Sequence, residues 1–337
     1  MVDLAAHGGD VYRYGKGVID FSANINPLGL PKSIKKAIYG NLDKILHYPD
    51  PAAKKVREKI AEYWGMACEN ILLGNGSAEL IYLIFSCFRP KTAAIPVPTF
   101  SEYELAARRA GSRIQFLKLK EEEGFRLNQD PTGSDILFVC NPNNPTGNLI
   151  FEDLRGVERL VVVDECFMDF LPDQKDHTLI RQAAKSRNLI VLRTFTKFFA
   201  MPGLRIGYLI AHKEIINKLR QHQPPWNTNC LAQIAAEIIL NDTGYIEKTH
   251  RLIEKERNFL FERLAKIDGL RPYPSVANFL LVRTENSSLD LKESLIKRQI
   301  LIRDCSNFRG LSDRYIRVAV RLRKENLQLL AALKEVL

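Results

Sequence analysis

The stretch LRTFTKFFAMPGLRIGYLI, residues 192–210, places a lysine and an arginine between two apolar runs. The apolar runs have the composition of buried strands, and the Pro-Gly step at 202–203 predicts a turn between them. Lys197 and Arg205 therefore belong to a connection between core strands. Charged residues in such a place raise the question of what they bind.

The segments around this stretch predict an α/β domain. Apolar runs at 71–73, 93–97, 114–119, 136–140, 160–164, 189–194 and 205–211 alternate with segments of helical composition. Several of the runs are continuous, which is typical of strands covered on both faces. The pattern predicts a mostly parallel, seven-stranded sheet with helices on its faces.

The remainder of the chain predicts a smaller α+β domain. Residues 213–267 have helical periodicity with one break at 223–227, where two prolines indicate a domain boundary. Beyond residue 270, short strands surround a helix at about 289–299, and a last helix closes the chain. We predict an N-terminal arm over residues 1–35, a large domain over 36–225 and a small domain over 226–337.

Composition narrows the functional classes. No apolar run approaches the roughly 20 residues that span a bilayer, and no apolar signal core stands at the N-terminus, so we expect a cytoplasmic protein with no membrane partner. Six cysteines stand without any CxxC pair, and no histidine- or cysteine-rich tail occurs; we predict no metal.

A net charge of +10 suits an anionic partner: nucleic acid, a membrane surface or a phosphorylated small molecule. Most lysines alternate with glutamates on helical segments, which indicates a solvated surface. A nucleic-acid-binding protein without enzymatic activity is therefore an alternative, but it predicts no ordered set of polar residues at the strand ends.

Five strand ends do carry such a set. In an open α/β sheet, ligands bind at the carboxyl ends of the strands. There the chain places a glycine turn (GNGSAE), an aromatic (PTF), an asparagine loop (NPNNPTG), Asp164, and Lys197 after two threonines. The glycine turn before a helix suits a phosphate, the lysine can condense with an aldehyde, and the carboxylate can keep a ring nitrogen protonated. Together they predict pyridoxal phosphate, with Arg205 reaching back to its phosphate.

Three segments resemble the fold type I pyridoxal-phosphate enzymes of the aspartate aminotransferase superfamily: NPNNPTG (141–147), VVVDE (161–165) and TFTKFFAMPGLRIGY (194–208). The resemblance implies Lys197 as the Schiff-base lysine, Asp164 at the pyridine nitrogen and Asn144 at the ring 3-hydroxyl. It also implies a set of residues around the cofactor ring and phosphate, namely Phe100 as the stacking aromatic with Gly76, Ser77, Thr194, Thr196 and Arg205 at the phosphate.

A further segment, HYPDP (47–51), is similar to the one by which dimers of this superfamily lend a tyrosine to the neighbouring cofactor phosphate. The resemblance therefore implies a homodimer in which Tyr48 reaches the other site.

Two branches of the superfamily compete, the threonine-phosphate decarboxylases of cobalamin biosynthesis and the histidinol-phosphate aminotransferases. The segments HGGD (7–10), DFSANINPLGLP (20–31), FFAMPGLR (198–205) and IRDCSNFRGL (302–311) resemble the decarboxylases more closely. Phe167 stands where the aminotransferases usually carry a tyrosine that binds the cofactor, which leaves more of that task to Asn144. The implied reaction converts O-phospho-L-threonine to 1-aminopropan-2-yl phosphate and CO₂; a preference for O-phospho-L-serine, one methyl smaller, stays open.

The resemblance to the decarboxylases also implies the residues that contact this small phosphorylated amino acid: His7, Gly8, Asn24, Asn144, Arg303 and Arg317. The period of two in YIRVAVR (315–321) places Arg317 and Arg321 on one face of a strand beside Ala319. Arg321 is therefore a further candidate for the substrate site.

Overall fold

The computed structural model describes residues 7–15, 17–128, 133–151 and 158–337. The first six residues of the predicted arm lie outside these ranges. Within them, no helix is both long enough and apolar enough to cross a membrane.

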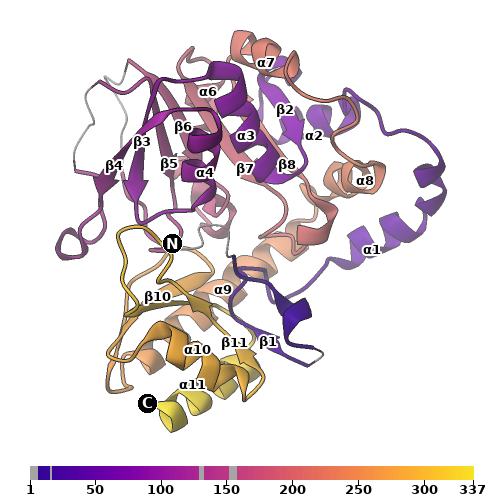
Figure 1. The fold of residues 1–337 in the computed structure, drawn as a ribbon. Helices are drawn as coiled ribbons and strands as arrows, with labels where there is room; N and C mark the ends of the chain where they lie inside the picture. The colour runs from indigo at the N-terminus through magenta and orange to yellow at the C-terminus, as the bar shows by residue number, and fades with distance from the viewer. Residues whose placement is uncertain (1–6, 16, 129–132, 152–157) are drawn as a thin grey trace.

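A seven-stranded sheet forms the large part of the molecule (Figure 1). Its order is β2 (Ile71–Gly74), β8 (Gly207–Ala211), β7 (Leu189–Thr194), β6 (Leu160–Asp164), β5 (Ile136–Cys140), β3 (Thr92–Val97) and β4 (Arg113–Lys118). Strand β8 runs antiparallel to both of its neighbours, and the other pairs are parallel. The predicted mostly parallel sheet is confirmed.

Helices cover both faces of this sheet, which explains why most of its strands read as continuous apolar runs; the edge strand β4 is partly exposed. Residues at alternating positions of β5 point to opposite faces: Ile136 and Phe138 join one core, and Leu137 and Val139 join the other. The first core is closed by α3 (Gly76–Phe88), α4 (Glu102–Arg109) and α7 (Lys213–Arg220). The second is closed by α1 (Lys32–Tyr39), α2 (Lys54–Trp64), α6 (Ile180–Ala183) and α8 (Cys230–Ile239).

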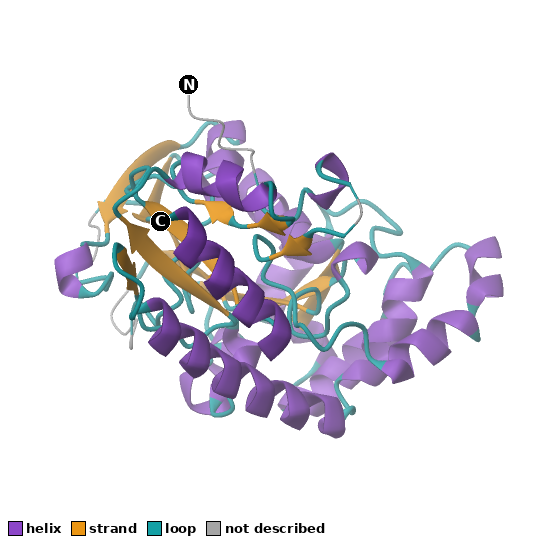
Figure 2. Ribbon diagram, turned by 90° about the horizontal axis from the view of Figure 1, so that it is seen from below, coloured by secondary structure: helices purple, strands orange, loops and turns teal. Residues whose placement is uncertain are grey.

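The small part is an antiparallel sheet with helices on one side (Figure 2). Its strands are ordered β12 (Arg303–Asp304), β13 (Tyr315–Ala319), β10 (Phe279–Thr284) and β9 (Leu270–Pro272). Apolar residues of α9 (Thr243–Leu264), α10 (Ser288–Ile296) and α11 (Arg323–Val336) pack against β10 and β13.

The segment predicted as an arm contributes to the small core. Strand β1 (Ile19–Asp20) pairs in parallel with β11 (Ile300–Leu301), and the two lie side by side in Figure 1. The backbone N–H of Ala319 donates to the carbonyl of Phe21 at 2.8 Å, and the Phe21 side chain is fully buried. A turn-rich sequence concealed this short strand; the domain boundaries themselves stay a prediction.

The helical region 213–267 breaks twice rather than once. Besides the predicted break after α7, the chain leaves helical geometry before α9, where the Asp242 carboxylate accepts a hydrogen bond from the backbone N–H of Tyr245 at 3.1 Å. An aspartate at this position is a favourable helix cap. The remaining short helices are α5 (Gln174–His177) and the 3₁₀ turns η1 (Val11–Arg13), η2 (Leu42–Leu46), η3 (Cys68–Asn70), η4 (Glu121–Glu123), η5 (Met168–Phe170) and η6 (Pro202–Leu204).

Candidate active site

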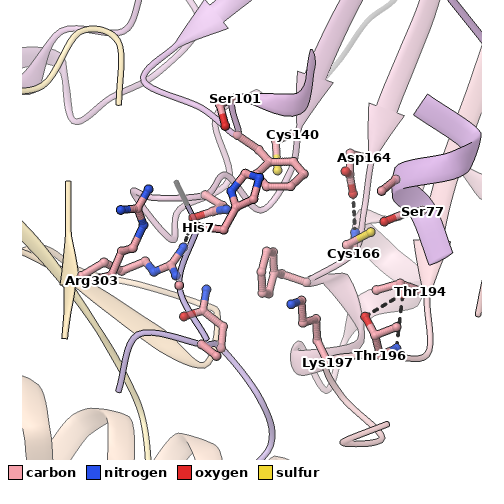
Figure 3. A pocket seen from close by; sticks show the side chains of 18 of the residues that line it. His7, Ser77, Ser101, Cys140, Asp164, Cys166, Thr194, Thr196, Lys197 and Arg303 are labelled. Atoms are coloured by element: carbon pink, nitrogen blue, oxygen red, sulfur yellow. Dashed lines mark hydrogen bonds between the residues drawn. The ribbon is translucent and has the colours of Figure 1, made fainter. Parts of the chain in front are cut away.

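One cavity lies at the carboxyl ends of β5, β6 and β7 and extends to the N-terminal segment and the small sheet. Figure 3 shows Asp164, Ser77, Thr194 and Thr196 on one side of it, with His7 and Arg303 on the other. The predicted site residues that line the cavity are His7, Gly8, Asn24, Ser77, Phe100, Asn144, Asp164, Thr194, Thr196, Lys197, Arg205, Arg303 and Arg317. Sheet topology therefore brings together residues that are up to 310 positions apart in the sequence.

One end of the cavity is built for a phosphate. Helix α3 begins at Gly76, and its first turn faces the cavity through Ser77. Gly76 has a positive φ of 76°, and a Cβ there would lie 2.3 Å from Nη2 of Arg205. Only glycine therefore lets the guanidinium approach the helix N-terminus, where free N–H groups and the helix dipole favour an anion. Thr194 and Thr196, whose hydroxyls are 2.9 Å apart, complete this end.

Lys197 and Asp164 face the same cavity from neighbouring strand ends. Burial, together with the positive charges of Arg317 and Arg205, lowers the pKa of Lys197 to about 8. A lowered pKa leaves more of the amine neutral near pH 7, which is the form that attacks an aldehyde.

The Asp164 carboxylate is held from two directions. It accepts hydrogen bonds from the Tyr103 hydroxyl at 2.7 Å and from the backbone N–H of Cys166 at 2.9 Å. Burial raises the pKa of Asp164, and these two hydrogen bonds oppose the rise. A positively charged partner in the cavity would offset the cost of burying this carboxylate.

The loop NPNNPTG leaves Asn144 to the cavity because its other polar side chains bind within the protein. Asn143 donates to the carbonyl of Pro98 at 2.9 Å, and Asn141 accepts from the backbone N–H of Ile150 at 2.8 Å. The amide oxygen of Asn144 accepts a hydrogen bond from Nη1 of Arg317.

Arg317 is a buried cation whose hydrogen bonds go to uncharged groups, the Asn144 amide and the carbonyl of Ser22 at 2.6 Å. Burial lowers the pKa of Arg317 to about 10. Such a group is suited to bind an anion, since a bound carboxylate would stabilise the buried charge.

The opposite end of the cavity carries His7, Gly8, Asn24 and Arg303. Gly8 packs so closely that a Cβ there would lie 2.2 Å from the carbonyl oxygen of Ser22. The guanidinium of Arg303 donates to the side chain of Asn307 at 2.7 Å and lies over the Phe308 ring. The N-terminal segment and the part of the small sheet around Arg303 therefore meet at this end of the cavity.

Two aromatic residues discussed above line the cavity. Phe100 is one of them, and its stacking on the cofactor ring stays a prediction. Phe167 also lines it and packs edge-on against Phe279, so its position offers no hydroxyl. Tyr103, three residues after Phe100, was not predicted as a site residue, although its hydroxyl donates a hydrogen bond to Asp164.

The structure does not bring three predicted residues into the cavity. Gly76 lies behind it, as the close approach to Arg205 requires. Arg321 binds Glu325 at 2.6 Å and the carbonyl of Asp20 at 3.1 Å, so its prediction as a substrate contact is not supported. The period of two that suggested it ends with β13 at Ala319. Tyr48 is 80% exposed and stacks on Trp226.

The donor set fits pyridoxal phosphate. The glycine-lined approach of Arg205 to α3 suits its phosphate, Asp164 suits its ring nitrogen, and Lys197 suits its aldehyde. Two buried polar atoms next to the cavity, Oδ1 of Asn24 and Nε of Arg317, have no hydrogen-bond partner within the described ranges. Buried polar atoms are rarely left so, which indicates that a ligand meets them.

Comparisons with known proteins agree with this geometry. A family model described as aminotransferase class I and II matches residues 16–333. A protein of Caldanaerobacter subterraneus subsp. tengcongensis, provisionally named a threonine-phosphate decarboxylase, is 42% identical over 97% of this chain and 93% of its own length. The threonine-phosphate decarboxylase of Salmonella typhimurium is 36% identical over 99% of this chain and 97% of its own.

Solved structures include both branches. The histidinol-phosphate aminotransferase of Clostridium acetobutylicum superposes with a TM-score of 0.87 at 37% identity, covering 94% of this chain and 98% of its own. The L-threonine-O-3-phosphate decarboxylase of Porphyromonas gingivalis superposes with a TM-score of 0.85 at 30% identity, with the same coverage. The fold is therefore common to both, and the residues of the cavity must separate them.

Proposed function

The chain belongs to the class I and II aminotransferase family, and from this premise we propose that it is a pyridoxal-phosphate-dependent decarboxylase of O-phospho-L-threonine. The product would be 1-aminopropan-2-yl phosphate, for use in cobalamin biosynthesis. Curated relatives named for this activity, similar over nearly the full chain, support the proposal.

One observation carries the choice of substrate. His7 and Gly8, from the HGGD segment, line the same cavity as Lys197, together with Arg303 from the small sheet. A cation and a histidine beyond the carboxylate-binding Arg317 suit a substrate with a second anionic group, a phosphate. The histidinol-phosphate aminotransferases also take a phosphorylated substrate, so the reaction itself must be tested.

The residues of the cavity have separate tasks in this proposal. Arg317 binds the substrate carboxylate, and His7 with Arg303 binds the phosphate, which fixes the bond that will break. When bound, pyridoxal phosphate supplies an electron sink for the pair left on Cα as CO₂ departs. Lys197 would hold the cofactor aldehyde, and its amine would donate the proton that Cα needs.

A product assay tests the proposal. The protein loaded with pyridoxal phosphate is given O-phospho-L-threonine, O-phospho-L-serine, or histidinol phosphate with 2-oxoglutarate, and CO₂ and glutamate are measured. We expect CO₂ from phosphothreonine without glutamate. Glutamate without CO₂ would contradict the proposal and favour the alternative, a histidinol-phosphate aminotransferase. Faster CO₂ release from O-phospho-L-serine would mean that this smaller amino acid, which lacks one methyl group, is the preferred substrate.

We also propose a homodimer in which Tyr48 binds the cofactor phosphate of the partner protomer. Several apolar side chains around Tyr48 are exposed in the single chain, including Ile45, Leu46 and Trp226. An exposed apolar patch of this kind marks a surface for association.

Replacing the tyrosine tests this proposal, because Tyr48→Phe removes one hydrogen bond to a charged phosphate. We expect the Kd of pyridoxal phosphate to rise about tenfold while the dimer mass is kept. Fluorescence titration and light scattering measure the two quantities, with Tyr39→Phe, another exposed tyrosine, as the control. A monomeric wild-type protein, or unchanged cofactor affinity, would contradict the proposal.

A further inference from the structure

The first turn of α4 holds three separate parts of the active site. Its residues Glu102, Tyr103 and Glu104 are consecutive, and successive residues of a helix point about 100° apart. Tyr103 binds Asp164 at the cofactor end. The two glutamates bind segments at the substrate end, from opposite ends of the chain.

Glu102 anchors the N-terminal segment. Its carboxylate binds Nε2 of His7 at 2.7 Å and accepts a hydrogen bond from the Tyr82 hydroxyl at 2.5 Å. The hydrogen bond with His7 lowers the pKa of Glu102 against the opposing effect of burial. A charged carboxylate therefore meets His7 at the edge of the cavity.

Glu104 anchors the loop that follows β12. Arg309 donates to both oxygens of the Glu104 carboxylate, from Nε at 2.9 Å and from Nη2 at 2.8 Å, and its guanidinium lies over the Phe116 ring. Burial alone would raise the pKa of Glu104, but the hydrogen bonds from Arg309 and Arg108 lower it. Arg303, which lines the cavity, lies in β12 directly before this loop.

The anchored residues share one place in the molecule. His7, Gly8, Ser22 and Arg303 line both the active-site cavity and a second cavity outside it, so they form the wall between the two. We call these four residues the phosphate wall. His7 and Arg303 reach this wall from the N-terminal segment and from the small sheet, and Figure 3 shows them on the same side of the site.

We propose that Glu102 and Glu104 are positioning residues, which hold the two sides of the phosphate wall against α4 so that His7 and Arg303 converge on the substrate phosphate. The proposal rests on the proposed function and names residues that the substrate itself does not touch. The helix dipole favours acidic residues in a first turn, but it does not explain why each binds a distant segment that lines the site. Arg309 is partly exposed, so its ion pair adds little to global stability, and its main effect falls on the loop.

The test uses holoenzyme variants E102Q and E104Q, in which the amide keeps the shape and loses the charge. We expect the Kd of inorganic phosphate and the KM of O-phospho-L-threonine each to rise about tenfold. The spectral response of the bound cofactor to L-threonine, which has no phosphate, should change little. Variant R309K keeps the charge without the two-oxygen contact and should shift the same two constants in the same direction.

E121Q is the matched control. Glu121 also joins a loop of the large part to the small sheet, through the hydroxyls of Tyr273 and Tyr315, but it does not line the cavity. Phosphate binding unchanged in E102Q and E104Q, or weakened as much in E121Q, would overturn the proposal. Tight phosphate binding by a wild-type protein that releases no CO₂ would overturn the proposed function instead, while the comparison of variants would still decide the positioning role.

Discussion

Replacing Lys197 with alanine is expected to lower the rate of CO₂ release from O-phospho-L-threonine by about 10⁴-fold. Two tasks meet on this side chain, attachment to the cofactor aldehyde and donation of the proton to Cα. Among the residues that the structure describes, Lys197 is the lysine that lines the cavity. Its pKa of about 8 suits both tasks, because a neutral amine attacks the aldehyde and a protonated one serves as the acid.

A second measurement separates loss of chemistry from loss of the fold. Borohydride reduction of the holoenzyme should fix the cofactor to the peptide containing Lys197 in the wild type and to no peptide in Lys197→Ala. The control is Lys213→Ala, since Lys213 is exposed at the start of α7. Labelling of another lysine, or retained CO₂ release in Lys197→Ala with an unchanged melting temperature, would contradict the assignment.

The sheet could be predicted from the sequence because it depends on a local property. All of its strands except the edge strand β4 are buried on both faces, so they read as short apolar runs between turns. Strands β1 and β9 do not have this signature: β1 is two residues in a turn-rich segment, and β9 contains Pro272. They form because partners distant in the sequence, such as β11 and β10, complete them.

The candidate site could be predicted in part for the same reason. Strand ends locate Asp164, Lys197 and the asparagine loop, because topology alone places them together. The roles of Glu102 and Tyr103 in α4 could not be predicted, because both residues fit the pattern of an ordinary helix. Their roles depend on hydrogen bonds with His7 and Asp164, which are distant in the sequence. Arg321 shows the converse error: its strand ends two residues earlier, and a neighbouring glutamate binds it.

Replacing Asp164 with asparagine is expected to lower kcat about a thousandfold, because a preorganised charge in a buried site stabilises developing charge strongly. The Asp164 carboxylate would hold a proton on the cofactor ring nitrogen, and this proton makes the ring an effective electron sink. Asparagine keeps the size of the side chain but cannot hold that proton. Steady-state CO₂ release measures the effect, and the absorbance of the bound cofactor shows whether its protonation has changed.

The control for this prediction is Tyr103→Phe, which leaves the carboxylate and removes one of its two hydrogen bonds. The pKa of Asp164 is raised by burial and lowered by the Tyr103 and Cys166 donors, so losing one donor should raise this pKa further. A cationic ring nitrogen opposes that rise, and we therefore expect kcat to fall by only about tenfold. Equal losses in the two variants would mean that Asp164 acts through the packing around Tyr103 rather than through its charge. A kcat unchanged in Asp164→Asn would remove the carboxylate from the mechanism altogether.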